Sequence, residues 1–309
     1  MDKSSKKYEV IIIGGGVAGM SAALWCDDLG ISAVLIEKKD EFGGQLLKVY
    51  NPIENHLGSV AENGKHLRDI FVKQLANRTF TRRLPAEITK IDFDNREVFL
   101  KNGDTIAAKA VVIATGVRRR KLNVENEDSY VGKGIIESGK KEQNTVEGKT
   151  VLIVGGGDAA LENSLILSET AAKVYVAHRR TEFRAREEFL EQAQNNPRIE
   201  FLTETVVQKI IGKEKLENVF VKNTKTGKID ELKVDYLLVR IGVEPNNELF
   251  SGKLAADESG YLKINAQCET DRKYIFAAGD IANPNSPTVS TAVGNGATVA
   301  KVILSLLNI

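Results

Sequence analysis

The chain has 309 residues, of which 42% are hydrophobic, so it is long enough for two globular domains with ordinary apolar cores. Its 43 basic and 42 acidic residues nearly cancel, which gives no support to a role in binding nucleic acid. No apolar run approaches the length that spans a bilayer, and the polar start MDKSSKKYEV lacks the apolar segment of a signal peptide. We therefore expect a cytoplasmic protein without membrane contact.

The two cysteines, Cys26 and Cys268, are too few and too far apart for a metal cluster or a Cys-x-x-Cys pair. We expect both to be buried packing residues, and we expect no metal site. A reactive role for Cys26 is the less favoured alternative.

The first forty residues contain the pattern of a dinucleotide-binding unit. Residues 10–13 form a β-branched run, typical of a strand that is buried on both faces. This run leads into Gly14, Gly16 and Gly19, a G-x-G-x-x-G spacing that permits a tight turn, close approach of a pyrophosphate and close packing of the next helix. A second apolar run ends at Glu37, an acid that can accept hydrogen bonds from ribose hydroxyls.

The pattern between residues 38 and 116 predicts a turn, a helix and an antiparallel insertion. The predicted elements are a glycine turn at 42–45, a helix over 66–76, and strands over 87–93, 97–100 and 108–113. The insertion spans 80–113 and ends in the segment VVIATG.

The basic run Arg118–Lys121 opens a polar stretch that we interpret as a linker. A solvated crossover between domains is the favoured reading. A docking patch for an acidic protein partner is the alternative.

The opening motif recurs 141 residues later. Residues 150–154 form another buried strand, followed by Gly155, Gly157 and Ala160 and by a helix predicted over 158–169. Position 178, which corresponds to Glu37, is a histidine.

Arginines follow this histidine, at positions 179, 180 and 184. An acid at the end of the second strand suits free ribose hydroxyls but repels a 2′-phosphate, whereas arginines bind that phosphate through charge-assisted hydrogen bonds. The first motif should therefore hold an adenosine ribose without a 2′-phosphate, and the second should hold NADPH.

The last third of the chain predicts strands over 201–206, 217–222, 234–241 and 274–278, a return crossover over 241–246 and a helix over 294–307. The strand over 274–278 leads into Gly279-Asp280. Asp280 is placed to bond the sugar-alcohol part of a flavin, or it simply caps a turn.

Together these segments resemble the low-molecular-weight thioredoxin reductase family from residue 8 to 308. The resemblance rests on IIIGGGVAGMSAA, FGGQL, ENHLG, VVIATG, VLIVGGGDAALENS, VAHRRTEFRA, IGVEPNNELF and YIFAAGDI. It implies an α/β fold of two Rossmann-like, three-layer ββα-type dinucleotide-binding domains, with the NADPH domain inserted into a split FAD domain. The implied boundaries are 1–117 with 246–309 for FAD and 118–245 for NADPH, and a homodimer is implied as well.

The resemblance also implies the residues that hold the cofactors. For FAD they are Gly14, Gly16, Gly19, Glu37, Lys38, Gly44, Gln45, Asn55, Thr115, Gly116 and Asp280. For NADPH they are Gly155, Gly157, Asp158, Ala159, His178, Arg179, Arg180, Arg184 and Ile241.

The chain departs from this family in two places. Ser138 and Lys141 stand about where the family carries its Cys-x-x-Cys, and a serine cannot form a disulfide. Residues 287–289 replace the family's usual Arg-Gln-Ala near the flavin ring. We therefore expect no thioredoxin reductase activity.

These observations predict an NADPH-dependent FAD oxidoreductase that passes electrons directly to an unidentified acceptor. No side chain is assigned a catalytic role; His56 could act as an acid, but an exposed loop position is the favoured reading. Two alternatives remain: a ferredoxin or flavodoxin–NADP reductase, and a catalytically silent flavin-binding regulatory protein. The reductases of the first alternative usually carry a C-terminal extension, which we do not expect behind the last helix here.

Overall fold

The computed structural model describes residues 6–308 and divides the chain into two compact units. The first unit combines the described parts of Met1–Arg118 and Glu244–Ile309, and the second is Arg119–Val243. The second unit is therefore inserted into the first along the sequence.

The first unit is built on a seven-stranded sheet in the order β3-β2-β1-β6-β5-β4, with β17 also pairing with β6. Its strands are β1 Lys6–Ile13, β2 Ala33–Ile36, β3 Thr81–Arg83, β4 Ile88–Asp92, β5 Glu97–Leu100, β6 Thr105–Ile113 and β17 Ile275–Ala277. The pairs within β3-β2-β1-β6 and the β6–β17 pair are parallel, while β4, β5 and β6 form an antiparallel meander. The sheet is thus parallel where the glycine motif ends β1.

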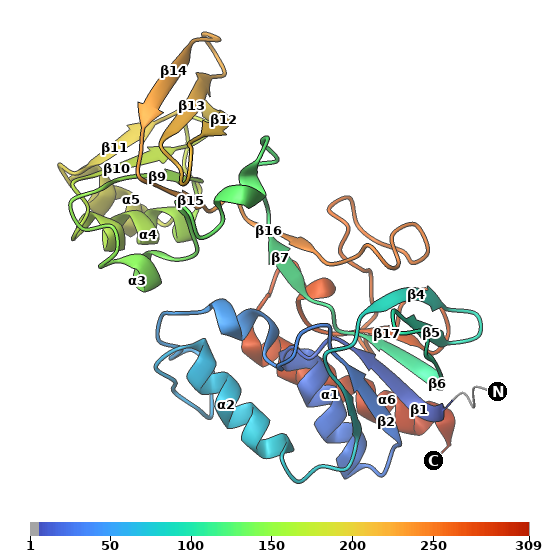
Figure 1. Ribbon diagram of the computed structural model, residues 1–309. Helices are drawn as coiled ribbons and strands as arrows, with labels where there is room; N and C mark the ends of the chain where they lie inside the picture. Colours follow the sequence, from blue (N-terminus) through green and yellow to red (C-terminus); the bar gives the residue numbers. More distant parts are fainter. Residues whose placement is uncertain (1–5, 309) are drawn as a thin grey trace. The chain divides into compact units, whose positions relative to one another are not determined.

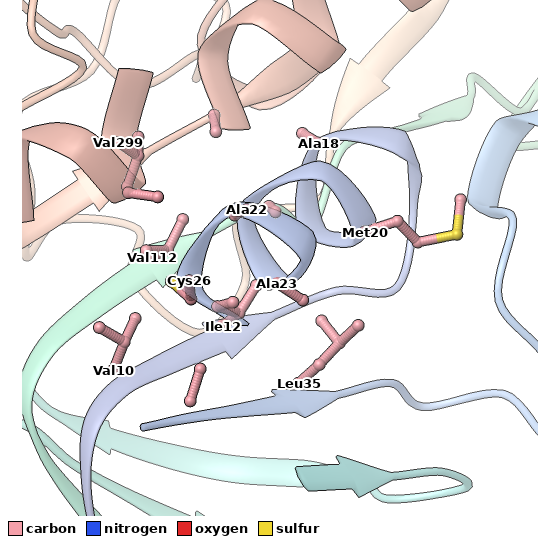
Figure 2. Packing of buried hydrophobic residues seen from close by; sticks show 14 of the residues in the cluster. Val10, Ile12, Ala18, Met20, Ala22, Ala23, Cys26, Leu35, Val112 and Val299 are labelled. Atoms are coloured by element: carbon pink, nitrogen blue, oxygen red, sulfur yellow. The ribbon is translucent and has the colours of Figure 1, made fainter. Parts of the chain in front are cut away.

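Helices cover one face of this sheet (Figure 1). They are α1 Val17–Asp28, α2 Gly64–Leu75 and α6 Val289–Leu307, with short 3₁₀ turns η1 Gly44–Lys48 and η3 Gly279–Ile281. Side chains alternate along β1, so Val10 and Ile12 join α1 and α6 in one core, whereas Ile11 and Ile13 join the core on the opposite face. Figure 2 shows the helix-side core, with Cys26 packed in it.

Helices α1 and α6 pack closely because a glycine lies at their crossing. A Cβ added to Gly296 would lie 2.6 Å from the Ala22 nitrogen and 2.7 Å from the Ala18 carbonyl oxygen. The Ser21 hydroxyl also donates a hydrogen bond to the Val293 carbonyl at 2.7 Å. The C-terminal helix is thereby fixed to the first helix of the chain.

Helix α6 corrects the expectation that no apolar run approaches membrane-spanning length. Among the helices of residues 6–308, it alone is long and apolar enough to cross a bilayer. The reason is its composition, since Lys301 is the single charged residue within its 19 residues. One of its faces is buried against α1, and core helices meet the same criterion, so this is weak support for a membrane span.

The second unit contains a parallel sheet in the order β11-β10-β9-β15-β8. Its strands are β8 Ile135–Ile136, β9 Thr150–Val154, β10 Lys173–Ala177, β11 Ile199–Leu202 and β15 Tyr236–Val239. Helices α3 Gly139–Glu142, α4 Asp158–Ser168 and α5 Glu187–Gln194 belong to this unit, together with the 3₁₀ turn η2 Glu127–Tyr130. An antiparallel sheet of β12 Thr205–Ile211, β13 Asn218–Asn223 and β14 Ile229–Lys233 packs on the core of the other face.

Two strands, β7 Val117–Arg119 and β16 Val243–Pro245, connect the units along the chain and pair with each other. These two strands overlap the crossovers that the sequence predicts over 118–121 and 241–246.

Several predicted boundaries were wrong. The predicted strand over 201–206 is interrupted by a turn, because Glu204 has a positive φ of 52° and separates β11 from β12. Strands β3 and β14 were not predicted, and β3 pairs in parallel with β2 although it lies within the segment that was expected to be an antiparallel insertion. The last helix begins at Val289 instead of 294, because the Thr288 side chain caps it by accepting from the Thr291 N–H.

Candidate dinucleotide-binding sites

Two glycines of the first motif are required by close backbone contacts. Gly14 has a φ of +108°, and a Cβ there would lie 2.3 Å from the Ala114 carbonyl oxygen. A Cβ on Gly19 would lie 1.9 Å from the Gly14 carbonyl oxygen, so the third glycine lets α1 approach the turn. The turn is thus fixed between β1, α1 and the end of β6.

The same turn recurs in the second unit with equivalent hydrogen bonds. The Gly14 N–H donates to the Ile36 carbonyl at 2.8 Å, and the Gly155 N–H donates to Ala177 at 3.0 Å. Each pair of positions differs by 141, the offset of the sequence motifs. The repeat extends further: the Gly43 N–H donates to the Gly15 carbonyl at 2.9 Å, and the Arg184 N–H donates to Gly156 at 2.7 Å.

Both turns leave a helix N-terminus open. Gly16 and Gly157 are the N-caps of α1 and α4, and no side chain caps either helix. A Cβ on Gly157 would meet nothing within 4 Å, and one on Gly16 would meet only a Gly44 carbon at 3.9 Å. Uncapped N–H groups with free space above them fit a pyrophosphate, so both cradles suit a dinucleotide.

Glu37, at the end of β2, binds its own glycine turn. Its Oε2 accepts from the Gly15 N–H at 2.6 Å, and its Oε1 accepts from the Lys39 N–H at 2.8 Å. The carboxylate is half-buried, and Phe42 packs beside it on the same side of Gly15, where an added Cβ would lie 3.0 Å from Oε2 and 2.5 Å from the Phe42 ring. The acid thus lies beside the cradle, while the neighbouring Lys38 turns away to pair with Glu87 at 3.0 Å.

His178 occupies the corresponding place in the second unit. A Cβ on Gly156 would lie 2.3 Å from the imidazole, and the Phe183 ring packs against that imidazole with centroids 4.9 Å apart. Phe183 is the 141-residue counterpart of Phe42. The end of the second strand is therefore built alike in both units, with an acid in one and an imidazole in the other.

Positive charge surrounds His178. Burial lowers the pKa of His178, and the guanidinium groups of Arg179, Arg180 and Arg184 lower it further. A hydrogen bond between Nε2 and the Glu182 carbonyl, at 3.0 Å, acts in the opposite direction. The structure thus gathers the predicted phosphate-binding residues around one imidazole.

Asp158, the first residue of α4, holds the loop that follows His178. Its Oδ1 accepts from the Arg186 N–H at 2.7 Å, and its Oδ2 accepts from Arg186 Nε at 3.1 Å. Asp158 is therefore engaged within the protein. The neighbouring Ala159 is exposed on the same turn, and Ile241 is 37% exposed beyond the end of β15.

Predicted flavin residues of the first unit fall into two groups. Gly44 lies against Gly16, and the Gln45 amide donates to the Val117 carbonyl. Thr115 exchanges hydrogen bonds with Asn246, which also donates its N–H to the Gly116 carbonyl at 3.0 Å.

Asn55 and Asp280 stand apart from that group. Asn55 is exposed in an irregular loop. Asp280 is half-buried in η3, and this burial raises the pKa of its carboxyl group. Its turn is held by Asn295, whose side-chain oxygen accepts from the Gly279 N–H at 3.1 Å.

The sequence favoured an exposed loop position for His56, the histidine next to Asn55, but the structure gives it contacts. His56 is half-buried, its Nδ1 lies 3.1 Å from the Ser290 hydroxyl, and its ring meets Phe71 edge-on. Ser290 lies in the first turn of α6, directly after the altered segment 287–289. The loop is thereby tied to the start of α6.

The segment that would carry the dithiol in the family is packed into the second unit. Ser138 is buried as the N-cap of α3, and its N–H donates to Glu142 Oε2 at 2.8 Å. The next N–H, of Gly139, donates to Asn163 Oδ1 at 2.6 Å. Lys141 pairs with Glu137 at 2.6 Å.

Both cysteines are free and buried, as expected. Burial raises the pKa of Cys26 to about 12 and that of Cys268 to about 11, so both thiols stay protonated near neutral pH.

The basic run has partners within the protein. Arg118 pairs with Glu244 at 2.8 Å and with Glu248, and Lys121 pairs with Asp128 at 2.5 Å. Arg119 and Arg120 donate to the backbone carbonyls of Glu137 and Val243. These contacts favour the crossover reading over the docking patch.

Sequence reasoning missed the middle glycines, Gly15 and Gly156, and the two phenylalanines beside them. The 141-residue offset predicts the pair Phe42 and Phe183, because the repeat extends beyond Glu37 and His178. The contact of Asn295 with Gly279 could not be predicted from the sequence, because a loop without a regular pattern separates the two residues.

Comparison with known proteins gives consistent relatives. Residues 8–296 match the model of the pyridine nucleotide-disulphide oxidoreductase family. The chain is 33% identical over 295 residues to the thioredoxin reductase of Streptomyces coelicolor, covering 94% of this chain and 91% of that one. It is 32% identical over 307 residues to the thioredoxin reductase of Bacillus subtilis, covering 96% and 94%.

Solved structures agree. The crystal structure of Lactococcus lactis thioredoxin reductase superimposes with a TM-score of 0.85 at 28% identity, covering 98% of this chain and 100% of that one. The Bacillus cereus bacillithiol disulfide reductase shares the fold, with a TM-score of 0.80 at 21% identity, covering 97% and 100%. These matches confirm the predicted α/β fold with two Rossmann-like parts and the predicted likeness to thioredoxin reductases.

Proposed function

The chain belongs to the pyridine nucleotide-disulphide oxidoreductase family, as a thioredoxin-reductase-like FAD- and NADPH-dependent oxidoreductase. On that premise we propose that it passes electrons from NADPH through FAD directly to an acceptor, without a dithiol of its own. When bound, the two cofactors supply hydride transfer and electron storage, while the protein supplies binding, orientation and access. FAD belongs to the first cradle and NADPH to the second in this proposal.

The observation that carries the assignment is the exchange of Glu37 for His178 at equivalent places. Both side chains lie against the middle glycine of a repeated turn, so the difference in charge acts at the same place in each site. The carboxylate accepts hydroxyl hydrogen bonds and repels a 2′-phosphate. The imidazole with its arginines attracts that phosphate, which supports NADPH at the second cradle.

Direct transfer is proposed from the chemistry at positions 138 and 141. A serine at the N-cap position of α3 and a lysine in an ion pair have no thiol to oxidise. Cys26 and Cys268 are buried with raised pKa values, so neither offers the accessible thiolate that disulfide exchange needs. We therefore propose that thioredoxin is not a substrate of this protein, although similar proteins are named thioredoxin reductase. A homodimer and a cytoplasmic location remain part of the proposal.

An anaerobic spectral titration tests this function. NADPH is expected to bleach the bound flavin, and NADH to do so far less effectively. Equal bleaching by NADH would contradict the role of the arginines, and no bleaching by either would favour the silent regulatory protein.

A second assay addresses the acceptor. With NADPH present, turnover is expected with small one- or two-electron acceptors but not with thioredoxin. Steady reduction of thioredoxin would disprove the direct route. Cytochrome c reduction that depends on added ferredoxin would support the ferredoxin–NADP reductase alternative.

A further inference from the structure

The loop over residues 54–60 carries a histidine to which the proposed function gives no role. We propose that His56 donates the proton that accompanies electron transfer to the acceptor, and that this acceptor is an apolar quinone. The inference rests on the proposed function, because it requires a reduced flavin that passes electrons directly to an acceptor. It makes His56 a catalytic residue of the acceptor half of the reaction.

The imidazole joins two segments that the sequence assigns separately to the flavin. Asn55, the preceding residue, is a predicted flavin contact, and Ser290 follows the altered segment 287–289. His56 and Ser290 are 234 positions apart in the chain, yet Nδ1 lies 3.1 Å from the Ser290 hydroxyl. Both assignments therefore meet at one histidine.

Packing connects this histidine to the first cradle. Val289, at the start of α6, and Val17, at the start of α1, pack against one buried cluster that includes Leu46 of η1. The turn of η3 meets the same part of α6, because a Cβ added to Gly279 would lie 3.8 Å from the Ala292 Cβ. The contact between His56 and the first turn of α6 thus lies on the side of the unit where α1 begins.

The loop that carries His56 is closed at its base. Ile53 and Ala61 are buried and form an antiparallel bridge, in which their N–H groups donate to each other's carbonyls at 2.8 and 3.0 Å. Both belong to the cluster that contains Leu46. Phe71 packs against that cluster, and its ring meets the imidazole edge-on with centroids 5.8 Å apart. The imidazole is therefore held between Phe71 and the start of α6.

The hydrogen bond to Ser290 leaves the second ring nitrogen for a substrate. In a protonated imidazole both nitrogens are donors, and a serine hydroxyl accepts from Nδ1. Nε2 then carries the proton that is transferred. The quinone gains a hydride from the reduced cofactor and a proton from Nε2, so it becomes a quinol through two electrons and two protons. The imidazole, left neutral, regains its proton from water.

The surface of the same loop indicates an apolar acceptor. Leu57 is 98% exposed and Val60 is 70% exposed, the two highest values among the large hydrophobic side chains of residues 6–308. Exposed apolar side chains that gather at one place mark a binding surface more often than scattered ones do. A quinone fits this loop, because it has an apolar ring and needs protons when it is reduced.

Two acceptors separate proton delivery from electron delivery. The FAD-loaded protein is reduced by NADPH and reoxidised either by a short-chain benzoquinone or by ferricyanide, which takes one electron and no proton. His56→Gln should lower the ratio of the quinone rate to the ferricyanide rate by about 100-fold or more, the usual contribution of a general acid. Ser290→Ala removes the partner that orients the ring and should lower the ratio less. His66→Gln, an exposed histidine in α2 of the same unit, should keep the wild-type ratio.

Leu57→Ser tests the apolar surface. It should raise the KM for the quinone several-fold relative to the KM for ferricyanide. An unchanged quinone KM would overturn the quinone assignment. A change of oligomeric state in gel filtration alongside that unchanged KM would show that a second copy of the chain covers the loop instead.

Chemical modification gives a readout that does not depend on turnover. Diethyl pyrocarbonate modifies accessible imidazoles, and peptide mass spectrometry follows each of the chain's three histidines separately. In the oxidised, FAD-loaded protein, saturating benzoquinone should slow the modification of His56 several-fold. The modification of His66 should keep its rate.

Each outcome decides the matter. If the wild type reduces both acceptors and His56→Gln keeps the wild-type ratio, the inference is overturned and the proposed function stands. Ferricyanide reduction without quinone reduction has the same meaning. Equal modification of His56 with and without the quinone would also overturn the inference, and this result needs only the wild-type protein. If the wild type reduces neither acceptor, the proposed function fails together with the inference.

Discussion

At the residue scale, the side chain that ends the second strand of each unit distinguishes the two cradles. The sequence predicted this pair, Glu37 and His178, because a turn and a helix of fixed length separate each from its glycines. It did not predict that Glu37 accepts from the Gly15 N–H or that Lys38 pairs with Glu87. Those contacts depend on side-chain torsions and on a partner 49 positions away, which no local pattern encodes.

Replacing Arg179 and Arg180 by alanine should weaken NADPH binding and spare NADH. A hydrogen bond to a charged group contributes about 1.5–3 kcal/mol, so the dissociation constant for NADPH should rise by at least about tenfold. Fluorescence titration of both nucleotides measures the two constants. Lys225→Ala, an exposed change in the hairpin of the same unit, is the control. A parallel loss of NADH affinity would show that the arginines act on the fold instead.

Neutralising the half-buried acid Asp280 should stabilise the flavin-free protein. Because its pKa is raised in the folded state, ionisation near neutral pH costs stability that is fully present only below its unfolded pKa. Asp280→Asn should therefore raise the melting temperature at neutral pH, with a gain that shrinks in acid.

Neutralising Asp92 should have the opposite effect on stability from neutralising Asp280. Hydrogen bonds from Asn95 lower the pKa of Asp92, so its stabilisation is present above the unfolded pKa and is lost as the pH falls through the folded one. Asp92→Asn should lower the melting temperature at neutral pH and lose its effect in acid. Thermal scans of both variants across pH are the measurement, and two shifts of the same sign would contradict this account.

At the element scale, strands that are buried on both faces were predicted well. β9 begins and ends where its apolar run does, and β2 likewise, because burial on both faces leaves a continuous apolar signal. The antiparallel sheet of the second unit was predicted poorly. β14 is largely exposed, and the turn before β12 depends on a non-glycine residue with positive φ, so neither leaves a periodic pattern. The start of α6 was missed because its cap, Thr288, follows a loop without apolar periodicity.

The α1–α6 contact predicts opposite effects for two glycines in one helix. Gly296→Ala would force a methyl group to within 2.6 Å of α1, and overpacking of this kind costs about 1–3 kcal/mol. Gly294→Ala meets nothing within 4 Å and should stabilise by about 0.5–1 kcal/mol through helix propensity. Chemical denaturation of both variants measures the difference. Equal effects would mean that the helices can separate without cost.

At the scale of the whole molecule, each unit has its own cores. The core residues of the first unit come from both of its chain segments, whereas those of the second all lie within Arg119–Val243. The length predicted two domains, and the family resemblance implied that one is inserted into the other. The exact boundary residues between the two units could not be predicted, because β7 and β16 have only three residues each, too few for a periodic pattern.

Separate cores should give separate responses to ligands in differential scanning calorimetry. Adenosine 2′,5′-bisphosphate should raise one unfolding transition and FAD the other, because a ligand stabilises only the unit that binds it. At about one hundred times its dissociation constant, each ligand should add about 2.7 kcal/mol to its own transition. A single transition raised by either ligand would show that the units unfold together.

The divided first unit also sets an order of events on the ribosome. β1 and α1 are made early, but β17 and α6, which complete their sheet and their helix-side core, are made last. The inserted unit has all of its strands once Val243 has emerged, so it can fold while the first remains open. At about 5–20 residues per second, the apolar face of α1 would wait roughly 13 to 52 seconds for α6. During that interval the nascent protein presents to chaperones the hydrophobic face of α1, which packs against α6 in the folded unit.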